Sequence, residues 1–194
     1  MKLFTPFRLL SLLVTVSLGF IPVRAASQTD SACAGVYLSF TDFINNKLTY
    51  AVNLNSPSES FSPPEIKKKL KIKLNDTTSF KLKDGSFYGY CFNGQRYRYY
   101  EAAFGYSGYF HVIDSGRLII YSHPVHQSRY GSYLKYYYSM DFKSRIYELS
   151  FENIKVDFID NPKFIEYVRN IRGLHLQAPN GTTKVNHLWS ESLK

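Results

Sequence analysis

The dipeptide Asn93-Gly94, set between two tyrosine-rich segments, is the feature that most restricts how this chain can fold. Asn-Gly favours a two-residue type I′ hairpin turn, because both central residues of that turn need positive φ. Such a turn fixes the register of its two strands, so Tyr90 is expected opposite Tyr97. Side chains alternate along each strand, and the hairpin should therefore have two distinct faces. The first face would hold Tyr88, Tyr90, Phe92, Tyr97 and Tyr99, and the second Phe87, Cys91, Arg96, Arg98 and Tyr100.

Further turn signals extend this hairpin into an antiparallel meander that ends near residue 150. Asp84-Gly85 also suits a type I′ turn, and Asp114-Ser115-Gly116 suits a three-residue loop with glycine in the left-handed region. The segments between these turns are rich in aromatic and β-branched residues, as strands are. The strands of the meander are expected at 86–92, 95–101, 106–113, 117–122, 132–138 and 145–149.

The chain before the meander contains shorter elements. Thr41 can cap a short helical turn, and residues 48–54 are typical of a strand. Residues 62–65, Ser-Pro-Pro-Glu, resemble a capping box with proline at the first helical position. A helical turn is therefore allowed there, with a strand expected after it. Residues 69–74 and 80–83 alternate strictly between lysine and apolar side chains, which predicts half-buried strands.

After Ser150 the apolar pattern changes from the period of strands to that of helices. Ser150 can cap one helix, Asn161-Pro162 can begin another, and Gly173 is a typical stop. The apolar stripes would be Phe151, Ile154 and Phe158 in the first helix and Phe164, Ile165, Val168 and Ile171 in the second. The expected fold class is therefore α+β, a predominantly antiparallel β meander with two C-terminal helices packed on one face.

The start of the chain predicts export. Residues 1–25 combine an early positive charge at Lys2 and Arg8 with an apolar run and small residues before a cleavage point after Ala25, the pattern of a secretory signal peptide. No later segment is apolar enough to cross a bilayer, so no transmembrane span is expected after cleavage. The predicted location is periplasmic or extracellular. The expected organisation is a signal peptide at 1–25, a flexible lead-in at 26–34, a single globular domain at 35–172 and a polar C-terminal tail at 173–194.

Export changes how the two cysteines are interpreted. Cys33 and Cys91 both follow the predicted signal, and in an oxidising compartment they can form a disulfide. In the chain-entropy model this bridge would stabilise the fold by about 4 kcal/mol. The alternative is two unpaired thiols, because the sequence does not give the distance between them.

A set of short motifs built from turn and core residues stands out together. They are Gly35-Val36-Tyr37-Leu38, Asp42-Phe43, Lys71-Ile72-Lys73-Leu74-Asn75-Asp76, Tyr88-Gly89-Tyr90 and a C-terminal run from Leu149 to Phe164. Over roughly residues 35–170 the chain resembles a family of small exported bacterial proteins of unknown function. The resemblance implies an exported globular domain and no catalytic residues. Cys91 stands where that pattern has a polar residue, so the resemblance implies no disulfide shared by the family.

Lysines on the two alternating segments form the first candidate binding surface. The net charge of +9 falls to +6 once Lys2, Arg8 and Arg24 of the signal are removed. If 69–74 and 80–83 pair with their lysines on one side, ammonium groups line one surface, where like charges opposed across strands reduce stability. The functional interpretation is an anionic partner, namely lipopolysaccharide, an acidic glycan or nucleic acid. A solvated face, or lysines that protect an exposed sheet edge, is the alternative. The candidate ligand-binding residues are Lys69, Lys71, Lys73, Lys81, Lys83, Arg96 and Arg98.

Tyrosines and histidines supply two further candidates. Between Tyr88 and Tyr138 lie 13 of the 17 tyrosines, which suits either ordinary sheet packing or a platform for a glycan or peptide. The loop expected at 114–116 would pair His111 with Ile119. His123 would then lie about 13 Å from His111, too far for both to bind one metal ion. We therefore predict no metal and no cofactor.

These patterns favour a binding function over catalysis. Gly105-Tyr106-Ser107-Gly108 departs from the Gly-x-Ser-x-Gly nucleophile elbow, so no catalytic residue is assigned. We predict an exported, non-catalytic domain that binds an envelope or extracellular polymer or another exported protein. Nucleic acid is the weakest candidate partner, because no nucleic-acid-binding signature is present. The alternatives are a secreted hydrolase whose site is assembled from scattered residues, and a structural or inhibitory partner protein.

Overall fold

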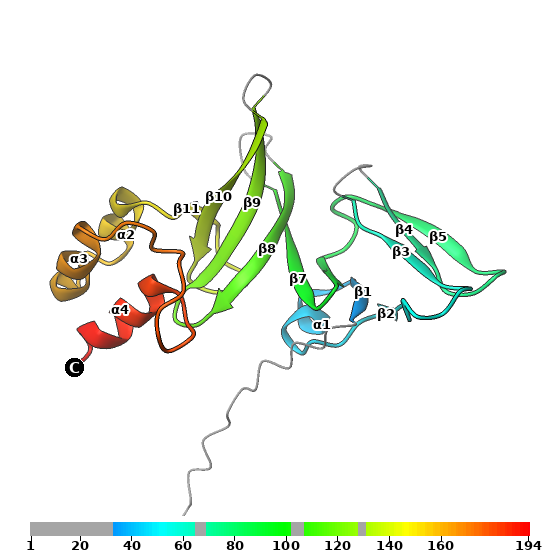
Figure 1. Cartoon of the computed structure of the whole chain (residues 1–194), viewed down its shortest axis with the longest axis horizontal. Coiled ribbons are helices and arrows are strands. Elements are labelled where there is room, and N and C mark those ends of the chain that lie inside the picture. The colour runs from blue at the N-terminus through cyan, green and yellow to red at the C-terminus, as the bar shows by residue number, and fades with distance from the viewer. Residues whose placement is uncertain (1–32, 65–68, 102–106, 128–130) are drawn as a thin grey trace, which may run out of the picture.

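The computed structural model describes residues 33–64, 69–101, 107–127 and 131–194, with the side chains at 126 and 127 left out. The predicted signal peptide at 1–25 lies outside the described residues. Figure 1 shows the arrangement of the elements. In chain order they are β1 (Ala34–Tyr37), α1 (Phe40–Ile44), β2 (Tyr50–Ala51), β3 (Ser60–Ser62), β4 (Lys69–Lys73), β5 (Ser79–Lys83), β6 (Gly89–Phe92), β7 (Gln95–Glu101), β8 (Ser107–Ser115), β9 (Ile119–Gln127), β10 (Gly131–Ser139), β11 (Tyr147–Glu148), α2 (Phe151–Asp157), α3 (Pro162–Arg169) and α4 (Lys184–Ser192).

The strands form two antiparallel sheets. The larger sheet has eight strands in the order β11-β10-β9-β8-β7-β6-β1-β2, so neighbours along the chain from β6 to β11 are also neighbours in space. The smaller sheet has three strands in the order β3-β4-β5. Together with the C-terminal helices, this confirms the predicted α+β class and the antiparallel meander.

The turn at Asn93-Gly94 has the predicted geometry. Asn93 and Gly94 have φ values of 50° and 75°, as a type I′ turn requires. β6 and β7 pair in the predicted register, with Tyr90 opposite Tyr97 and Phe92 opposite Gln95. The register in turn separates the stacked tyrosines on one face from the arginines on the other.

Two aromatic residues before β6 lie on the opposite faces from those predicted. Phe87 stacks on Tyr109, with 5.2 Å between the ring centroids, whereas Tyr88 packs against Phe43 at 5.2 Å on the other side of the sheet. Regular pairing of β6 begins only at Gly89, and the chain bends over residues 86–88, so strand alternation does not apply there. The predicted placement of Phe87 and Tyr88 is therefore wrong.

The second predicted type I′ turn, at Asp84-Gly85, is also wrong. Among the described residues only Asn46 and Asn93 have positive φ without being glycine, so Asp84 does not adopt the required conformation. β5, which ends at Lys83, belongs to the three-stranded sheet, whereas β6 pairs with β1 and β7 of the large sheet. The chain therefore passes between sheets at this point.

The three-stranded sheet packs its apolar side on the large sheet. Phe61, Leu70 and Ile72 are buried in one cluster with Tyr90 and Tyr109 of the large sheet. Phe80 and Leu82 pack against the same cluster. Side-chain alternation then directs the lysines of β4 and β5 away from the large sheet.

The predicted helices α2 and α3 begin as expected. The Ser150 side chain accepts a hydrogen bond from the Asn153 backbone N–H, and the Asn161 side chain accepts one from Phe164. Ile154 and Phe164 are fully buried in a cluster with Ile120 and Tyr138 of the large sheet. The two helices thus pack on one face of the sheet, as predicted.

The expected polar tail at 173–194 instead contains a third C-terminal helix, α4. Val185 on α4 is completely buried, and Trp189 contacts Phe158 and Phe164 with ring centroids 5.1 and 5.2 Å apart. Asp114 of β8 accepts hydrogen bonds from the backbone and hydroxyl of Thr183. The expectation of a loose tail is therefore wrong, because contacts from distant parts of the chain hold this segment.

The three-residue loop predicted at 114–116 is also wrong. β8 continues through Ser115, which pairs with Ile119, and the turn lies between them. Leu118 in this turn is fully buried. This later turn, together with a one-residue register shift between Val112 and Asp114, places His111 opposite Ser122 rather than Ile119.

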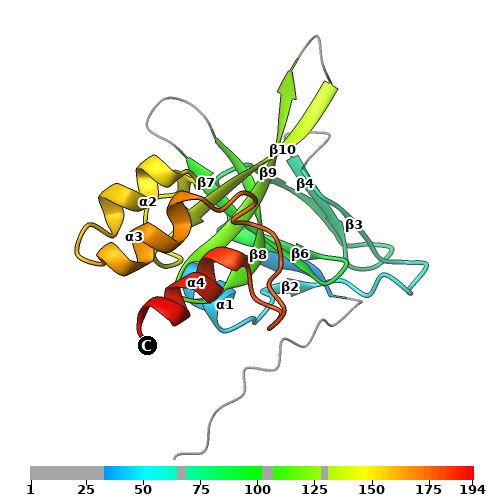
Figure 2. The ribbon, with the colours of Figure 1, turned by 60° about the vertical axis from the view of Figure 1, so that its left-hand side comes forward.

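The helices and the three-stranded sheet cover the same face of the large sheet. Tyr109 and His111 are two residues apart on β8 and therefore share a face of the sheet. Ile120 and Ser122 share a face of β9 in the same way, and Ser122 pairs with His111, so Tyr109 and Ile120 lie on the same face. Tyr109 lies under the three-stranded sheet and Ile120 under the helices. Figures 1 and 2 show the helices at one end of the large sheet and the three-stranded sheet at the other.

Shorter elements near the start of the described chain differ in detail from the expectation. Ser39, not Thr41, caps α1, through a reciprocal capping box with Asp42. Ala34 is 1% exposed and begins β1, so the flexible lead-in does not extend through this residue. The strand predicted at 48–54 is reduced to β2. The helical turn considered for 62–65 ends outside the described residues, and Ser62 belongs to β3.

Candidate functional site

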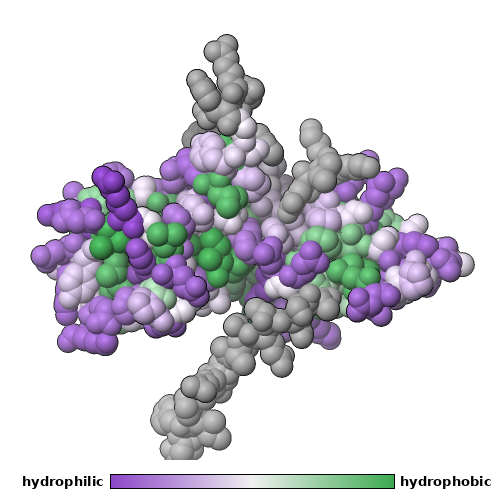
Figure 3. Space-filling model, viewed as in Figure 1, coloured by the Kyte–Doolittle hydropathy of each residue, from purple (hydrophilic) through white to green (hydrophobic). Residues whose placement is uncertain are grey.

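The lysines of β4 and β5 lie on one outward face, which is the arrangement that the candidate binding surface required. Lys69 lies opposite Lys83, and Lys71 lies opposite Lys81, in an antiparallel ladder. Lys73 continues the row on β4 and faces Ser79. In Figure 3, hydrophilic residues cover the outer rim of the molecule at the end occupied by this sheet.

Three serines that were not among the predicted ligand-binding residues complete this surface. Ser60 of β3 lies opposite Lys73, and Ser62 lies opposite Lys71. Because directly opposed residues point to the same side of a sheet, these hydroxyls stand beside the ammonium groups. We call this surface the lysine face; its residues are Ser60, Ser62, Lys69, Lys71, Lys73, Ser79, Lys81 and Lys83.

The short serine side chains leave room between the lysines. An open depression of about 410 Å³ lies on the lysine face. Residues of β3, β4 and β5 line it, including Ile72 of β4 and Phe80 of β5. Its polar lining consists of Ser60, Ser62, Lys71, Lys73, Ser79 and Lys81. All of these polar side chains can donate hydrogen bonds, and the lysines can only donate.

The positive charge of the lysine face is mostly unneutralised within the protein. Lys73 forms an ion pair with Asp76, with Nζ 2.8 Å from the carboxylate oxygen. Among the described residues, no carboxylate lies within 4.0 Å of the ammonium groups of Lys69, Lys71, Lys81 or Lys83. An anion brought to this surface would therefore meet cations that are free to bind it.

Arg96 and Arg98, included in the predicted ligand-binding set, lie in a different environment. They point to the opposite face of the large sheet from the three-stranded sheet, and Arg98 is 4% exposed. Arg98 donates to the Tyr121 hydroxyl and to the Ser144 carbonyl, at 3.0 Å each. The structure does not place Arg98 on an exposed surface, and it separates both arginines from the lysine face.

Arg96 is held by aromatic rings and a carbonyl group. Its guanidinium carbon lies 4.2 Å from the centroid of the Phe43 ring and 5.6 Å from that of Phe142, and it donates to the Phe43 carbonyl. Burial lowers the pKa of Arg96 from its ordinary value, although the nearby Tyr37 acts in the opposite direction. Arg96 therefore connects α1 and the 140–146 loop to the sheet.

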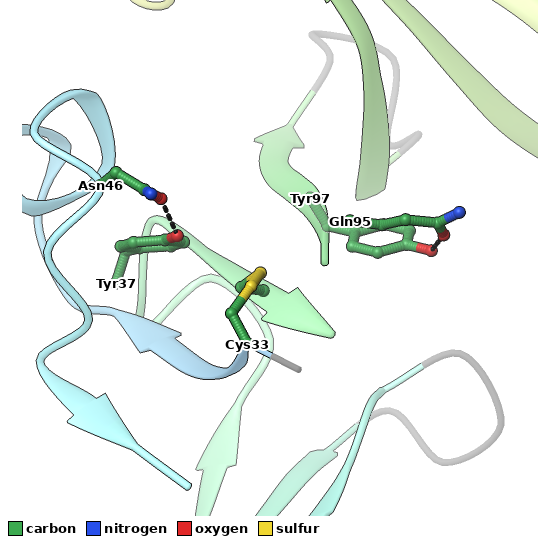
Figure 4. The surroundings of a disulfide bond; sticks show 6 residues. Cys33, Tyr37, Asn46, Gln95 and Tyr97 are labelled. Atoms are coloured by element: carbon green, nitrogen blue, oxygen red, sulfur yellow. Dashed lines mark hydrogen bonds between the residues drawn. A yellow bond between two sulfur atoms is a disulfide. The ribbon is translucent and has the colours of Figure 1, made fainter. Parts of the chain in front are cut away.

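Cys33 and Cys91 form a disulfide, the first of the two alternatives left open by the sequence. Their Cα atoms are 6.0 Å apart, across the β1–β6 pair. Cys91 is completely buried, and Figure 4 shows the bond beside Tyr37, whose hydroxyl donates to Asn46 at 2.6 Å. Disulfides of this kind persist in oxidising compartments, which agrees with the predicted export.

Most of the tyrosines in the large sheet serve packing. Tyr90 stacks on Tyr97 with 4.5 Å between ring centroids, and Tyr90, Tyr121 and Tyr138 are fully buried. Burial raises the pKa of Tyr121, and it raises that of Tyr88 to about 12. Tyr133 on β10 is the clearest exception to this packing role, with 49% of its surface exposed.

The histidines do not converge as a metal site. The predicted separation of about 13 Å between His111 and His123 rested on the wrong register, because these residues occupy neighbouring ladder positions. The His111 ring contacts Ser122 at 3.3 Å on one face, whereas His123 stacks on Phe110 on the other. In the described part of the chain, no group of three His, Cys, Asp or Glu side chains is placed to hold a metal ion.

The Ser122–His111 contact does not by itself make a catalytic pair. Ser122 is 6% exposed, so its hydroxyl has little access to a substrate. A nucleophilic serine must reach the reacting carbonyl from an accessible position. The lysine face is therefore the best-supported candidate site.

Comparison with known proteins does not assign the chain to a family. No protein-family model, curated protein or solved structure matches the chain. Within the described residues, none of the helices combines the length and the apolar character needed to cross a membrane.

Proposed function

We propose that this protein is an exported binding domain whose lysine face attaches to an anionic polymer of the cell envelope or the extracellular space. The single observation that carries the proposal is the direct opposition of lysines across β4 and β5, with Lys71 facing Lys81 and Lys69 facing Lys83. Like charges held opposite each other in a sheet reduce stability. Binding an anion would convert that unfavourable arrangement into a favourable one.

The position of β4 argues against edge protection as the reason for these lysines. Lysine often blocks edge strands from pairing with other chains. β4 is the central strand of the small sheet, with β3 on one side and β5 on the other, yet it carries Lys69, Lys71 and Lys73. Edge protection can explain Lys81 and Lys83 on β5, and Lys69, which lies beyond the end of the β3 pairing, but it does not explain Lys71 or Lys73.

The surface chemistry supports an extended ligand. The depression on the lysine face is open, and the lysines on β4 span four residue intervals, or about 13 Å at ~3.3 Å per residue. A polymer with repeated negative charges can contact several ammonium groups at once, and each contact releases bound counterions. The resemblance to small exported bacterial proteins agrees with a partner outside the cytoplasm.

The proposal is tested by measuring the affinity of residues 26–194 for dextran sulfate, with uncharged dextran as the reference polymer. We expect binding to dextran sulfate only, with affinity that falls steeply between about 50 and 200 mM salt. The double variant Lys71→Gln/Lys81→Gln should bind at least about tenfold more weakly, because two of the four unpaired ammonium groups are lost.

A matched control separates the lysine face from general charge. Lys155 on α2 and Lys163 on α3 are exposed, and the variant Lys155→Gln/Lys163→Gln removes the same net charge. This control should retain most of the affinity. Equal loss in the two double variants would show that net charge alone attracts the polymer, and the proposal would then be wrong.

A further inference from the structure

We infer that the lysine face selects polymers carrying tetrahedral oxyanion esters, namely phosphate or sulfate groups, over polymers carrying carboxylates. The inference rests on the proposed function, since it concerns the ligand class of the same surface. It comes from the way hydroxyl and ammonium groups are combined in rows across the three strands.

One row runs across all three strands of the small sheet. Ser62 on β3, Lys71 on β4 and Lys81 on β5 are paired in register, with Lys71 opposite both neighbours. Adjacent strands lie ~4.8 Å apart, so the two outer residues of the row are separated by about 10 Å. The long lysine side chains can lean over the depression, whereas the serine hydroxyl remains close to the sheet.

This row offers donors from three directions. A phosphate or sulfate ester presents three terminal oxygens pointing different ways, and each can accept a hydrogen bond. A carboxylate presents two oxygens in one plane, which suits a forked planar donor such as arginine better than separate ammonium groups. The lysine face has lysines and serines but no arginine, so its donor set fits a tetrahedral group.

The next row contains a carboxylate that restricts where the anion can bind. Lys73 lies between Ser60 and Ser79, and its ammonium group is already paired with Asp76. A second anion at Lys73 would be repelled by that carboxylate. The favoured positions are therefore at the pair Lys71 and Lys81 and at the pair Lys69 and Lys83.

The two lysine pairs repeat along the strands. They are two residues apart on β4 and on β5, which corresponds to about 6.6 Å at ~3.3 Å per residue. Two neighbouring ester groups on one polymer chain can then occupy the two pairs together. Joint occupation raises the affinity, because the second contact forms within an already bound chain.

The test compares polymers that share one dextran backbone and one degree of substitution, bearing sulfate, phosphate or carboxymethyl groups. Sulfate and carboxymethyl groups each carry a single negative charge, so a difference between them reports geometry rather than charge. We expect sulfate and phosphate dextran to bind residues 26–194 about tenfold or more tightly than carboxymethyl dextran, as a charge-assisted hydrogen bond would provide. Tighter binding of phosphate dextran alone would reflect the larger charge of the phosphate group and would count against the inference.

A serine variant tests whether the hydroxyl contributes to the selectivity. Ser62→Ala should weaken binding of sulfate dextran severalfold and leave carboxymethyl dextran nearly unchanged. The control is Ser190→Ala on the exposed side of α4, which should alter neither affinity. Equal affinity for sulfate and carboxymethyl dextran would overturn this inference while leaving the proposed function in place. Failure to bind all three charged polymers would overturn the proposed function itself.

Discussion

Lys71 on β4 lies directly opposite Lys81 on β5, on the outward face of the three-stranded sheet. Among the described residues, no carboxylate forms an ion pair with either ammonium group. The apolar side of the same strands is buried, with Leu70 and Ile72 at 0% and 1% exposure. Burial on one face therefore fixes the register that keeps the two lysines together on the other.

The disulfide should be a major contributor to stability. Cys33 and Cys91 are 58 residues apart in sequence and join the ends of β1 and β6. Replacing both with serine should lower the free energy of unfolding by about 4 kcal/mol, because the unfolded chain gains loop freedom. Urea denaturation followed by circular dichroism measures the difference. A change below about 1 kcal/mol would contradict the expected role of the bridge.

Arg98 should matter for stability rather than for polymer binding. Arg98→Ala removes the donor to Tyr121 and to the Ser144 carbonyl and leaves a buried cavity, so we expect a loss of about 2–4 kcal/mol. At a temperature where the variant remains folded, its affinity for dextran sulfate should be close to that of the parent protein. Arg169→Ala, on the exposed surface of α3, is the control and should change stability by less than about 0.5 kcal/mol.

The C-terminal helix α4 should behave as part of the core. Trp189 packs against both Phe158 and Phe164, and Trp189→Ala should destabilise the protein by about 3 kcal/mol. The control is Leu193→Ala, at the residue directly after α4, whose side chain is 67% exposed. This control should change the free energy of unfolding by no more than about 0.5 kcal/mol. Similar midpoints for both variants in urea would show that α4 is not docked as described.

The buried tyrosines predict unfolding in alkali. Burial raises the pKa of Tyr88 to about 12 and raises that of Tyr37 and Tyr121 as well, so the folded state holds these protons more tightly than the unfolded state does. Their contribution to stability is fully present below the ordinary tyrosine pKa of about 10 and is lost as pH rises through the folded-state pKa. Tyrosinate absorbance and circular dichroism should therefore change together above about pH 10. Ionisation of all tyrosines without loss of structure would contradict this prediction.

Local sequence signals predicted the elements whose geometry depends on neighbouring residues. Asn93-Gly94 specified its own turn, and Ser150 and Asn161 specified the starts of two helices, because the relevant hydrogen bonds are made within a few residues. The alternation of lysine with apolar residues likewise predicted that the lysines share one side of each strand, and the pairing of β4 with β5 brings the two sides together.

The errors arose where distant contacts decide the structure. Asp84-Gly85 indicates a reversal, but nothing local shows that the chain then enters a different sheet. The Thr183 side chain makes no cap hydrogen bond within α4 and donates instead to Asp114, which lies 69 residues away in sequence. The serines of the lysine face were missed because β3 was not predicted, so nothing indicated that Ser60 and Ser62 would lie beside lysines.

The most direct test of the account is to measure stability and binding on the same variant, Lys81→Glu. This change places a carboxylate opposite Lys71, and a cross-strand pair of opposite charge should raise the free energy of unfolding by about 0.2–1 kcal/mol. Lys155→Glu on α2 makes the same change in net charge away from the lysine face and serves as the control. We predict that Lys81→Glu is more stable than the parent protein and binds dextran sulfate at least tenfold more weakly than Lys155→Glu. The variant loses one ammonium group of the pair, and the new carboxylate repels the sulfate groups. A variant that is less stable, or that binds as well as the control, would contradict the claim that these opposed lysines are held in place to bind an anion.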